Sequence, residues 1–167
     1  GVNTLVDSIE YLPKSFKLVC VGGSGKYLSD FKTYVKKVPY SDRINVIAHV
    51  PKMELLKYIE DADVLVLPNT AKDKMSLYTS PIKLFEYMAS HRPIVASNLS
   101  SITEVLSNKN SFLFNPDNAK DLADNIVKAV SLDCSKIVEQ AHKDVKFFTW
   151  EKRAKNIKRF INSIHNN

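Results

Sequence analysis

The stretch "SPIKLFEYMASHRPIVAS", residues 80–97, joins a helix to a buried strand and decides the fold class. Ser80 is a good N-cap and Pro81 suits the first helical position, so the sequence predicts a helix that begins there. Leu84 and Met88 lie four residues apart on one apolar face of that helix. The run "PIVAS" that follows is apolar and rich in β-branched residues, and it predicts a buried strand. A helix that leads directly into such a strand is typical of an α/β protein.

Four more runs of this kind predict strands: "FKLVCVG" (16–22), "INVIAHV" (44–50), "DVLVLP" (63–68) and "SFLF" (111–114). Helical faces are predicted between them from Leu28, Phe31, Val35 and Val38, from Met53, Leu56 and Ile59, and from Leu122, Ile126 and Val130. Strands that are apolar on both faces and alternate with helices predict a parallel sheet of about five strands, covered by helices on both sides. This is a Rossmann-like, doubly wound α/β fold.

The first predicted helix, residues 2–12, places Leu5, Val6, Ile9 and Leu12 on one side. A doubly wound sheet normally starts with a strand, and none is predicted before this helix. We therefore expect residues 1–167 to form one domain of a longer protein, whose first strand precedes Gly1.

Composition is that of an ordinary globular chain, with 44% hydrophobic and 25% charged residues among 167. No apolar run approaches the ~20 residues that span a bilayer, and the first residues lack the pattern of a signal peptide. Cys20 lies in a predicted buried strand and Cys134 in a distant helical stretch, which does not look like a disulfide pair. These features favour a reducing, cytoplasmic location.

The net charge of +6 is concentrated near the C-terminus, where "WEKRAKNIKRF" (150–160) carries five basic residues. Its apolar side is formed by Trp150, Ile157, Phe160, Ile161 and Ile164. We interpret it first as a docked helix with a solvated basic face. Peripheral contact with anionic lipid headgroups at the inner face of the membrane is the second interpretation. No nucleic-acid partner is predicted, because no recognition motif or aromatic platform accompanies the charges.

A glycine-rich turn, "VGGSGKY" (21–27), follows the first predicted strand but matches neither named phosphate motif. A Walker loop needs Gly where Cys20 stands and Ser or Thr where Tyr27 stands, and the dinucleotide pattern needs a third glycine in place of Leu28. From these residues alone a tight strand-to-helix turn is the better interpretation. Ligands bind at the carboxyl ends of parallel strands, so this turn and the long loop 68–80 should share one edge.

Glu86 is the candidate binding residue of the helix at that edge. Its carboxylate could accept paired hydrogen bonds from a sugar diol. The alternative is a surface ion pair with Lys83, worth only ~0.2–0.5 kcal/mol. The helix alone does not decide between the two.

Several blocks together resemble the C-terminal half of the retaining glycosyltransferases with the GT-B fold, known as glycosyltransferase family 4. They are "VGGSGKYLSDF", "INVIAHVPKMELLKYIEDADVLVLPN", "SPIKLFEYMASHRPIVASNLSSITEVL" and "NSFLFNPDNAKDLADNI", in that order. The resemblance implies that this domain binds a nucleotide sugar, and that a second Rossmann-like domain, normally N-terminal, binds the acceptor.

The family signature is a pair of glutamates with seven residues between them. Glu86 matches the second, which the resemblance assigns to the ribose hydroxyls, whereas Tyr78 stands at the first, where a phenol cannot reproduce the two acceptors of a carboxylate. This departure puts the donor-sugar contact of that position in question. The loop Thr79, Ser80, Pro81 and Ile82 would offer backbone amides to the diphosphate or sugar.

By the same resemblance, Gly22, Gly23 and Ser24 form the turn that lets the diphosphate and the partner domain approach. His49, Val50 and Pro51 match the segment that lines the base pocket, although a lone histidine at a strand end is more often structural. The family's Arg and Lys for the diphosphate come from a strand before the first helix. We therefore expect residues 1–167 alone to bind donor weakly and to transfer nothing.

The sequence thus predicts the donor-binding domain of a retaining glycosyltransferase of polysaccharide biosynthesis. It would use a UDP- or GDP-type sugar donor and a glycan or lipid acceptor, with no cofactor and no obligatory metal. The alternative is a non-catalytic nucleotide or nucleotide-sugar binding module, which the Tyr78 departure favours. An unrelated doubly wound regulatory domain would leave the ordered blocks unexplained.

Overall fold

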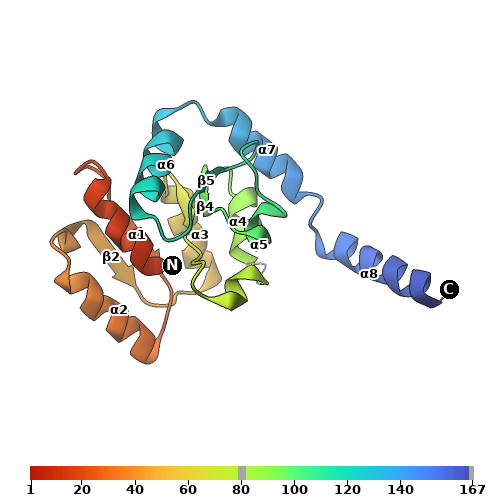
Figure 1. Ribbon diagram of the computed structural model, residues 1–167, viewed down its shortest axis with the longest axis horizontal. Coiled ribbons are helices and arrows are strands. Elements are labelled where there is room, and N and C mark those ends of the chain that lie inside the picture. The colour runs from red at the N-terminus through yellow and green to blue at the C-terminus, as the bar shows by residue number, and fades with distance from the viewer. Residues whose placement is uncertain (79–81, 166–167) are drawn as a thin grey trace.

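The computed structural model describes residues 1–78 and 82–165 (Figure 1). Its elements, with η for 3-10 helices, are α1 (Val2–Ser8), η1 (Ile9–Tyr11), β1 (Leu18–Val21), α2 (Gly25–Lys37), η2 (Ser41–Arg43), β2 (Ile44–Ile47), α3 (Lys52–Asp61), β3 (Leu65–Leu67), η3 (Lys74–Leu77), α4 (Ile82–Ala89), β4 (Ile94–Ser97), α5 (Ser100–Thr103), β5 (Phe112–Phe114), α6 (Ala119–Ser131), α7 (Ser135–Val145) and α8 (Trp150–His165).

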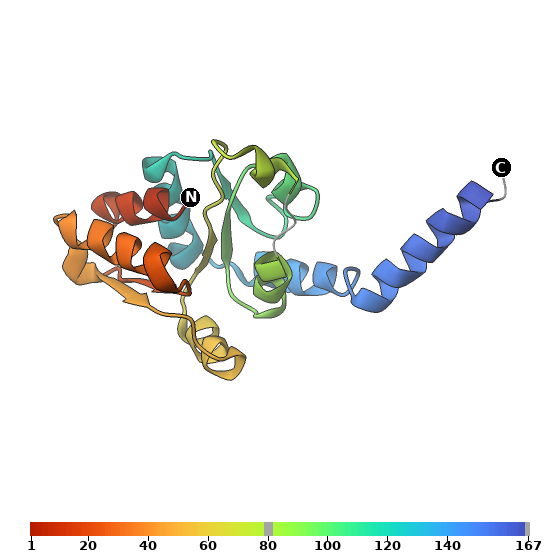
Figure 2. The same cartoon turned by 90° about the horizontal axis from the view of Figure 1, so that it is seen from below.

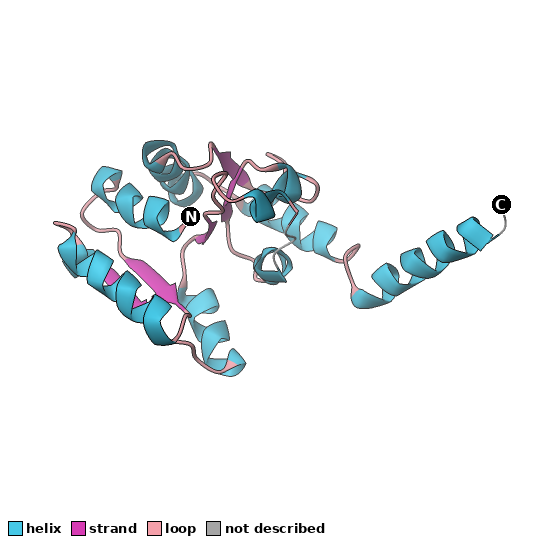
Figure 3. Cartoon of the chain, turned by 60° about the horizontal axis from the view of Figure 1, so that its bottom comes forward, coloured by secondary structure: helices cyan, strands magenta, loops and turns pink. Residues whose placement is uncertain are grey.

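The five predicted strands are all present and pair in parallel, which confirms the α/β fold class. They form two sheets where one was expected: β1 pairs with β2, and β4 lies between β3 and β5. Figure 3 shows the two groups of strands apart. Within the described residues β1 and β3 do not pair, because a cavity separates them that residues of both strands line.

The core divides in the same way. One apolar cluster joins α1 and α6 to the first sheet and extends to Val95 and Phe114 of the second. The other joins α4, α5 and α7 around β3 and β4. Every residue of β4 is buried, whereas none of β1 is fully buried. The second sheet therefore has both faces covered, and the first is open on its side toward β3.

The predicted N-terminal helix is confirmed as α1 and η1, in which Leu5, Val6 and Ile9 are buried; Leu12, which follows η1 in an extended conformation, is buried as well. The connection to β1 is held by Arg43. Its guanidinium donates to the carbonyls of Ile9 (3.1 Å), Leu12 (3.2 Å), Pro13 (2.6 Å) and Phe16 (3.0 Å). One side chain, at the end of η2, therefore fixes the path by which the chain enters β1.

The predicted face of α3 is partly wrong. Met53 is 74% exposed and Leu56 is also exposed, while Ile59 is buried and Leu55 half-buried. The helix has apolar residues at neighbouring positions, so periodicity alone permits two faces, and packing selects the one that contains Leu55. Val130 of α6 is likewise exposed, although Leu122 and Ile126 are buried as predicted.

The C-terminal helix α8 projects away from the rest of the molecule (Figures 1 and 2). The expectation of a docked apolar side is wrong for the described chain, because Trp150 is 76% exposed and Ile157, Phe160, Ile161 and Ile164 are exposed as well. Local contacts partly shield its first turn: Lys152 lies over the Phe147 ring and Arg153 over Trp150. No helix in the described ranges is both long and apolar enough to cross a membrane.

Candidate functional site

The glycine turn after β1 has the left-handed backbone that glycine favours. Gly22 and Gly23 have φ of 131° and 79°, and Gly25 has φ of 55°. A Cβ added to Gly22 would meet no atom within 4 Å, so the backbone angle and not crowding requires glycine there. Ser24 precedes α2 as its N-cap in an extended conformation, and its side chain makes no capping hydrogen bond.

The loop after β2 lies beside this turn, whereas the sequence predicted a shared edge for the turn and the loop 68–80. The His49 amide donates to the Gly23 carbonyl at 3.1 Å. The His49 side chain is exposed, Val50 is half-buried, and Pro51 is the N-cap of α3. The two loops therefore form one continuous segment of the sheet edge at the carboxyl ends of β1 and β2.

The loop after β3 is fixed by Asp117, a residue that no sequence motif indicated. Its carboxylate accepts from the Thr70 hydroxyl (2.7 Å) and from the Ala71 amide (3.0 Å). Burial raises the pKa of this carboxyl, but the two hydrogen bonds and the nearby charge of Lys72 lower it by more, so the pKa in the folded chain is below its ordinary value. The only sequence signal was "NPDN" (115–118), a turn in which Asp tolerates the left-handed φ of 61° seen here.

Glu86 lies on α4, half-buried, and lines the cavity between β1 and β3 together with Lys83 and Tyr87. Within the described residues it has no ion pair, and the predicted alternative of a surface pair with Lys83 is not formed. Burial raises the pKa of Tyr87, and the neighbouring Glu86 and Cys20 raise it further. Glu86 is therefore a half-buried carboxylate that can accept hydrogen bonds from a ligand.

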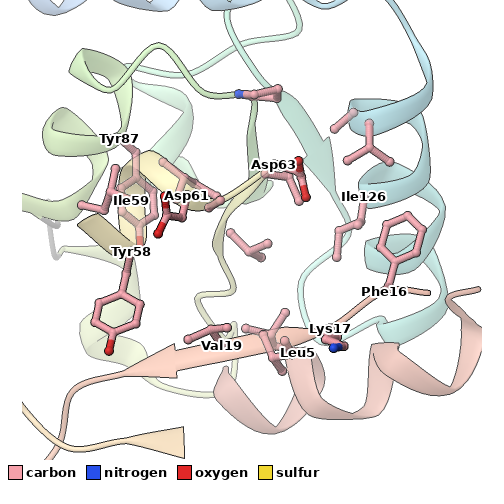
Figure 4. A pocket seen from close by; sticks show the side chains of 18 of the residues that line it. Leu5, Phe16, Lys17, Val19, Tyr58, Ile59, Asp61, Asp63, Tyr87 and Ile126 are labelled. Atoms are coloured by element: carbon pink, nitrogen blue, oxygen red, sulfur yellow. The ribbon is translucent and has the colours of Figure 1, made fainter. Parts of the chain in front are cut away.

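The structure brings only part of the predicted set together. Figure 4 shows the cavity, which has a volume of about 790 Å³. Val21 and Glu86 are among the residues that line it, whereas the glycines and His49 are not. Tyr78 is 83% exposed and Ile82 is exposed too. Thr79, Ser80 and Pro81, which were also predicted to contribute to the site, lie outside the described residues. The structure thus supplies the paired loops at the sheet edge and, separately, Glu86 in the cavity lining.

Two histidines are brought together that sequence reasoning did not connect. His91, at the end of α4, and His142, on α7, stack with ring centroids 3.8 Å apart. The His142 Nδ1 atom is buried without a hydrogen-bond partner. In the described ranges no group of three or more His, Cys, Asp or Glu side chains could hold a metal ion, and the absence of an obligatory metal stays a prediction.

Comparison with known proteins gives the family. The model of the family "Glycosyl transferases group 1" matches residues 1–131. This chain belongs to the group 1 glycosyltransferases. Among curated relatives, the amylovoran biosynthesis glycosyltransferase AmsK of Erwinia amylovora is 26% identical over 95 residues, which are 57% of this chain and 23% of AmsK.

Solved structures show that this group 1 glycosyltransferase has the fold of the C-terminal domain of GT-B enzymes. Sucrose-phosphate synthase of Thermosynechococcus elongatus matches 99% of this chain and 42% of its own, with a TM-score of 0.79 and 22% identity. Anabaena HepE, solved in complex with UDP-glucose, matches 98% of this chain and 45% of its own, with a TM-score of 0.78 and 17% identity. The chain therefore spans less than half the length of these relatives.

Proposed function

We propose that residues 1–167 are the donor-binding half of a longer retaining glycosyltransferase. The observation that carries the proposal is Glu86, a half-buried carboxylate on α4 with no ion pair in the described chain, in a family of sugar-transferring enzymes. Its two oxygens can accept from both hydroxyls of a ribose. HepE, a protein of the same fold, was solved with UDP and with UDP-glucose, which supports a nucleoside-diphosphate sugar as donor.

The chemistry of such a site follows from charge. When the sugar leaves the donor, negative charge grows on the nucleoside diphosphate and must be stabilised by fixed donors. We propose that the turn at Gly22, Gly23 and Ser24 lets the diphosphate approach the start of α2, where backbone amides point outward. The acceptor, a glycan or a lipid, would be bound by the other half of the longer protein.

The test is calorimetric titration of the longer protein and its Glu86→Gln variant with UDP-glucose and with its 2′-deoxyribose analogue. The substitution keeps the size but removes charge-assisted hydrogen bonds worth ~1.5–3 kcal/mol, so affinity for the ribose donor should fall by roughly 10- to 150-fold. The deoxy donor should lose much less, since one of the two bonds is absent from the start.

Glu10→Gln is a matched control, because Glu10 is an exposed carboxylate in η1, outside the cavity lining. It should leave donor affinity unchanged. Equal affinities of wild type and a folded Glu86→Gln variant would remove Glu86 from the site and with it the main support for donor binding.

A non-catalytic nucleotide-sugar binding module remains the second candidate, because Tyr78 stands at the position of the first glutamate of the family signature and its side chain is largely exposed. Radiolabelled sugar transfer by the longer protein separates the two functions. Donor binding without transfer or hydrolysis, at enzyme concentrations where binding is saturated, would favour the module.

A further inference from the structure

A second pocket, the β5 pocket, lies beside β5, between α6 and the first turn of α7 (Figure 1). Its volume of about 420 Å³ is typical of small-molecule sites. Among the described residues, none lines both this pocket and the larger cavity that contains Glu86. Most ligand sites are lined mainly by apolar side chains. The β5 pocket differs, because seven of its eleven lining residues are polar: Asn98, Asn108, Ser111, Asn115, Asp121, Asn125 and Lys128.

The outer edge of β5 offers one unpaired backbone donor and one unpaired acceptor. In the described sheet β5 pairs with β4 alone. The Phe114 carbonyl accepts from the Asn98 amide, which follows β4, at 2.8 Å. Alternate residues of a strand direct their backbone groups to opposite neighbours. The N–H and C=O groups of Leu113 therefore face away from β4, and Leu113 is part of the pocket lining.

The rest of this edge is closed to a further strand. The Ser111 amide already donates to the Ser107 carbonyl at 2.9 Å. The Asn115 amide donates to the Asp121 carboxylate at 2.7 Å. A pairing strand would need these two donors as well as that of Leu113. The edge is therefore suited to a small ligand and not to an extended peptide.

Helix α6 adds a buried acceptor to the pocket. Asp121, Asn125 and Lys128 are spaced four and three residues apart, on one face of the helix, and all three line the pocket. Asn125 is only 7% exposed, and its Nδ2 atom donates to the Asp121 carbonyl (2.8 Å) and carboxylate (3.1 Å). These two bonds fix the orientation of the amide. The Asn125 Oδ1 atom accepts from no group of the described chain, and an unpaired buried acceptor costs free energy that a ligand hydroxyl would recover.

The rim of the β5 pocket carries further polar groups that the described chain does not use. The side chains of Asn98, Asn108 and Asn115 are exposed and make no hydrogen bond within the described residues. Lys128 is exposed and has no ion pair there. An asparagine amide both donates and accepts, whereas a lysine only donates. Ile137 of α7 adds an apolar surface beside these groups.

The chemistry of the lining argues against a metal ion and against a phosphate. Each carboxylate oxygen of Asp121 already accepts a hydrogen bond, one from the Asn115 amide and one from Asn125 Nδ2. A phosphate would meet a single cation, Lys128, together with the negative charge of Asp121. Closely spaced neutral donors and acceptors beside an apolar surface instead match a ring of hydroxyl groups, each of which donates once and accepts twice.

We propose that the β5 pocket binds one sugar unit of a glycan. The backbone groups of Leu113 and the Oδ1 atom of Asn125 bind its hydroxyls from inside the pocket, and the rim asparagines bind them from outside. A glycan held there is tethered to the enzyme, which raises the local concentration of its other sugar units. The proposal does not rest on donor binding, because Glu86 lies in the other cavity.

NMR titration of the longer protein, labelled with ¹⁵N-leucine, tests the proposal. The probes are methyl α-glucoside, methyl α-galactoside and methyl α-mannoside, which differ in the orientation of their hydroxyls. Saturating UDP is present throughout, so that a nucleotide site elsewhere on the protein is filled. At least one glycoside should shift the amide signal of Leu113, which is assigned from its absence in the Leu113→Met variant. No shift of this signal with any of the three glycosides would overturn the proposal.

Variants of the rim locate the binding. Asn98→Ala and Asn115→Ala remove exposed amides without hydrogen bonds in the described chain, so both variants should fold as wild type does. Each should weaken glycoside binding by about 2- to 10-fold, the effect of one hydrogen bond. Asn3→Ala is the matched control, since Asn3 is exposed on α1 and outside the lining. Equal affinities of both rim variants and wild type would overturn the proposal. A Leu113 signal that shifts with protein concentration alone would also overturn it, because a second copy would then occupy the edge.

Discussion

Asp117 holds the loop after β3 against the start of α6, and replacing it should loosen this part of the sheet edge. Its carboxylate accepts from Thr70 Oγ1 and from the Ala71 amide while its own backbone is left-handed, with φ of 61°. Loss of both hydrogen bonds should cost about 1.5–3 kcal/mol, the amount of one charge-assisted bond, because the residue is half exposed and two bonds to one carboxylate are not additive.

Three variants separate the loss of the hydrogen bonds from the strain of the left-handed backbone. Asp117→Gly removes the hydrogen bonds and the Cβ that strains the left-handed backbone, whereas Asp117→Ala removes the hydrogen bonds but keeps a Cβ there and should be about 1 kcal/mol less stable than Asp117→Gly. Asp117→Asn keeps one acceptor oxygen and tolerates the angle, so its stability should lie between those of wild type and Asp117→Gly. Urea denaturation at pH 7 measures the free energy of unfolding of each variant.

The pH dependence gives an independent check. Because the pKa of Asp117 is lower in the folded chain, its contribution is complete above the unfolded value of about 3.9 and is lost as pH falls below it. The stability of Asp117→Asn should lack this decrease at low pH, because asparagine does not titrate. If the glycine and alanine variants unfolded within about 0.5 kcal/mol of wild type, or alanine proved the more stable of the two, the reasoning about this residue would be refuted.

Two more predictions concern the first sheet. Arg43→Ala should lower the free energy of unfolding by about 2–3 kcal/mol, because four carbonyls lose a charged donor; Arg43→Lys should restore only part of this in urea denaturation, since lysine lacks the planar fork. Burial raises the pKa of Cys20 from 9.0 to about 11, so stability should fall between those pH values as the thiolate becomes favoured in the unfolded chain. The stability of Cys20→Ala should depend less on pH in this range. If it depended on pH as strongly as that of wild type, the pH dependence would not come from Cys20.

Sequence reasoning succeeded where the signal is local. Each strand is a short apolar run with turn residues at its ends, and the positive φ of Gly22 and Gly23 follows from a glycine pair after a strand. The helix that carries Glu86 was predicted for the same reason and is present as α4, whereas the role of Glu86 in binding stays a prediction. The face of α3 was misjudged because Leu55 and Leu56 are adjacent, and only tertiary packing selects between them.

The features that were missed depend on distant partners. Asp117 contacts Thr70 across 47 positions of the chain, and His91 stacks on His142 of another helix. No window of sequence contains both members of either pair. The separation of β1 from β3 is of the same kind, because it is a property of two strands and the space between them.

The exposed helix α8 also has a hydrodynamic consequence. Its 16 residues extend about 24 Å at 1.5 Å per residue, and it carries this mass away from the body of the molecule. A compact chain of 167 residues has a radius of gyration of about 15 Å. With α8 extended, we expect a radius in solution above that value, and slower rotation about the two axes perpendicular to the helix than about the helix axis. The chain should therefore tumble as an elongated particle and elute from a sizing column ahead of globular proteins of equal mass.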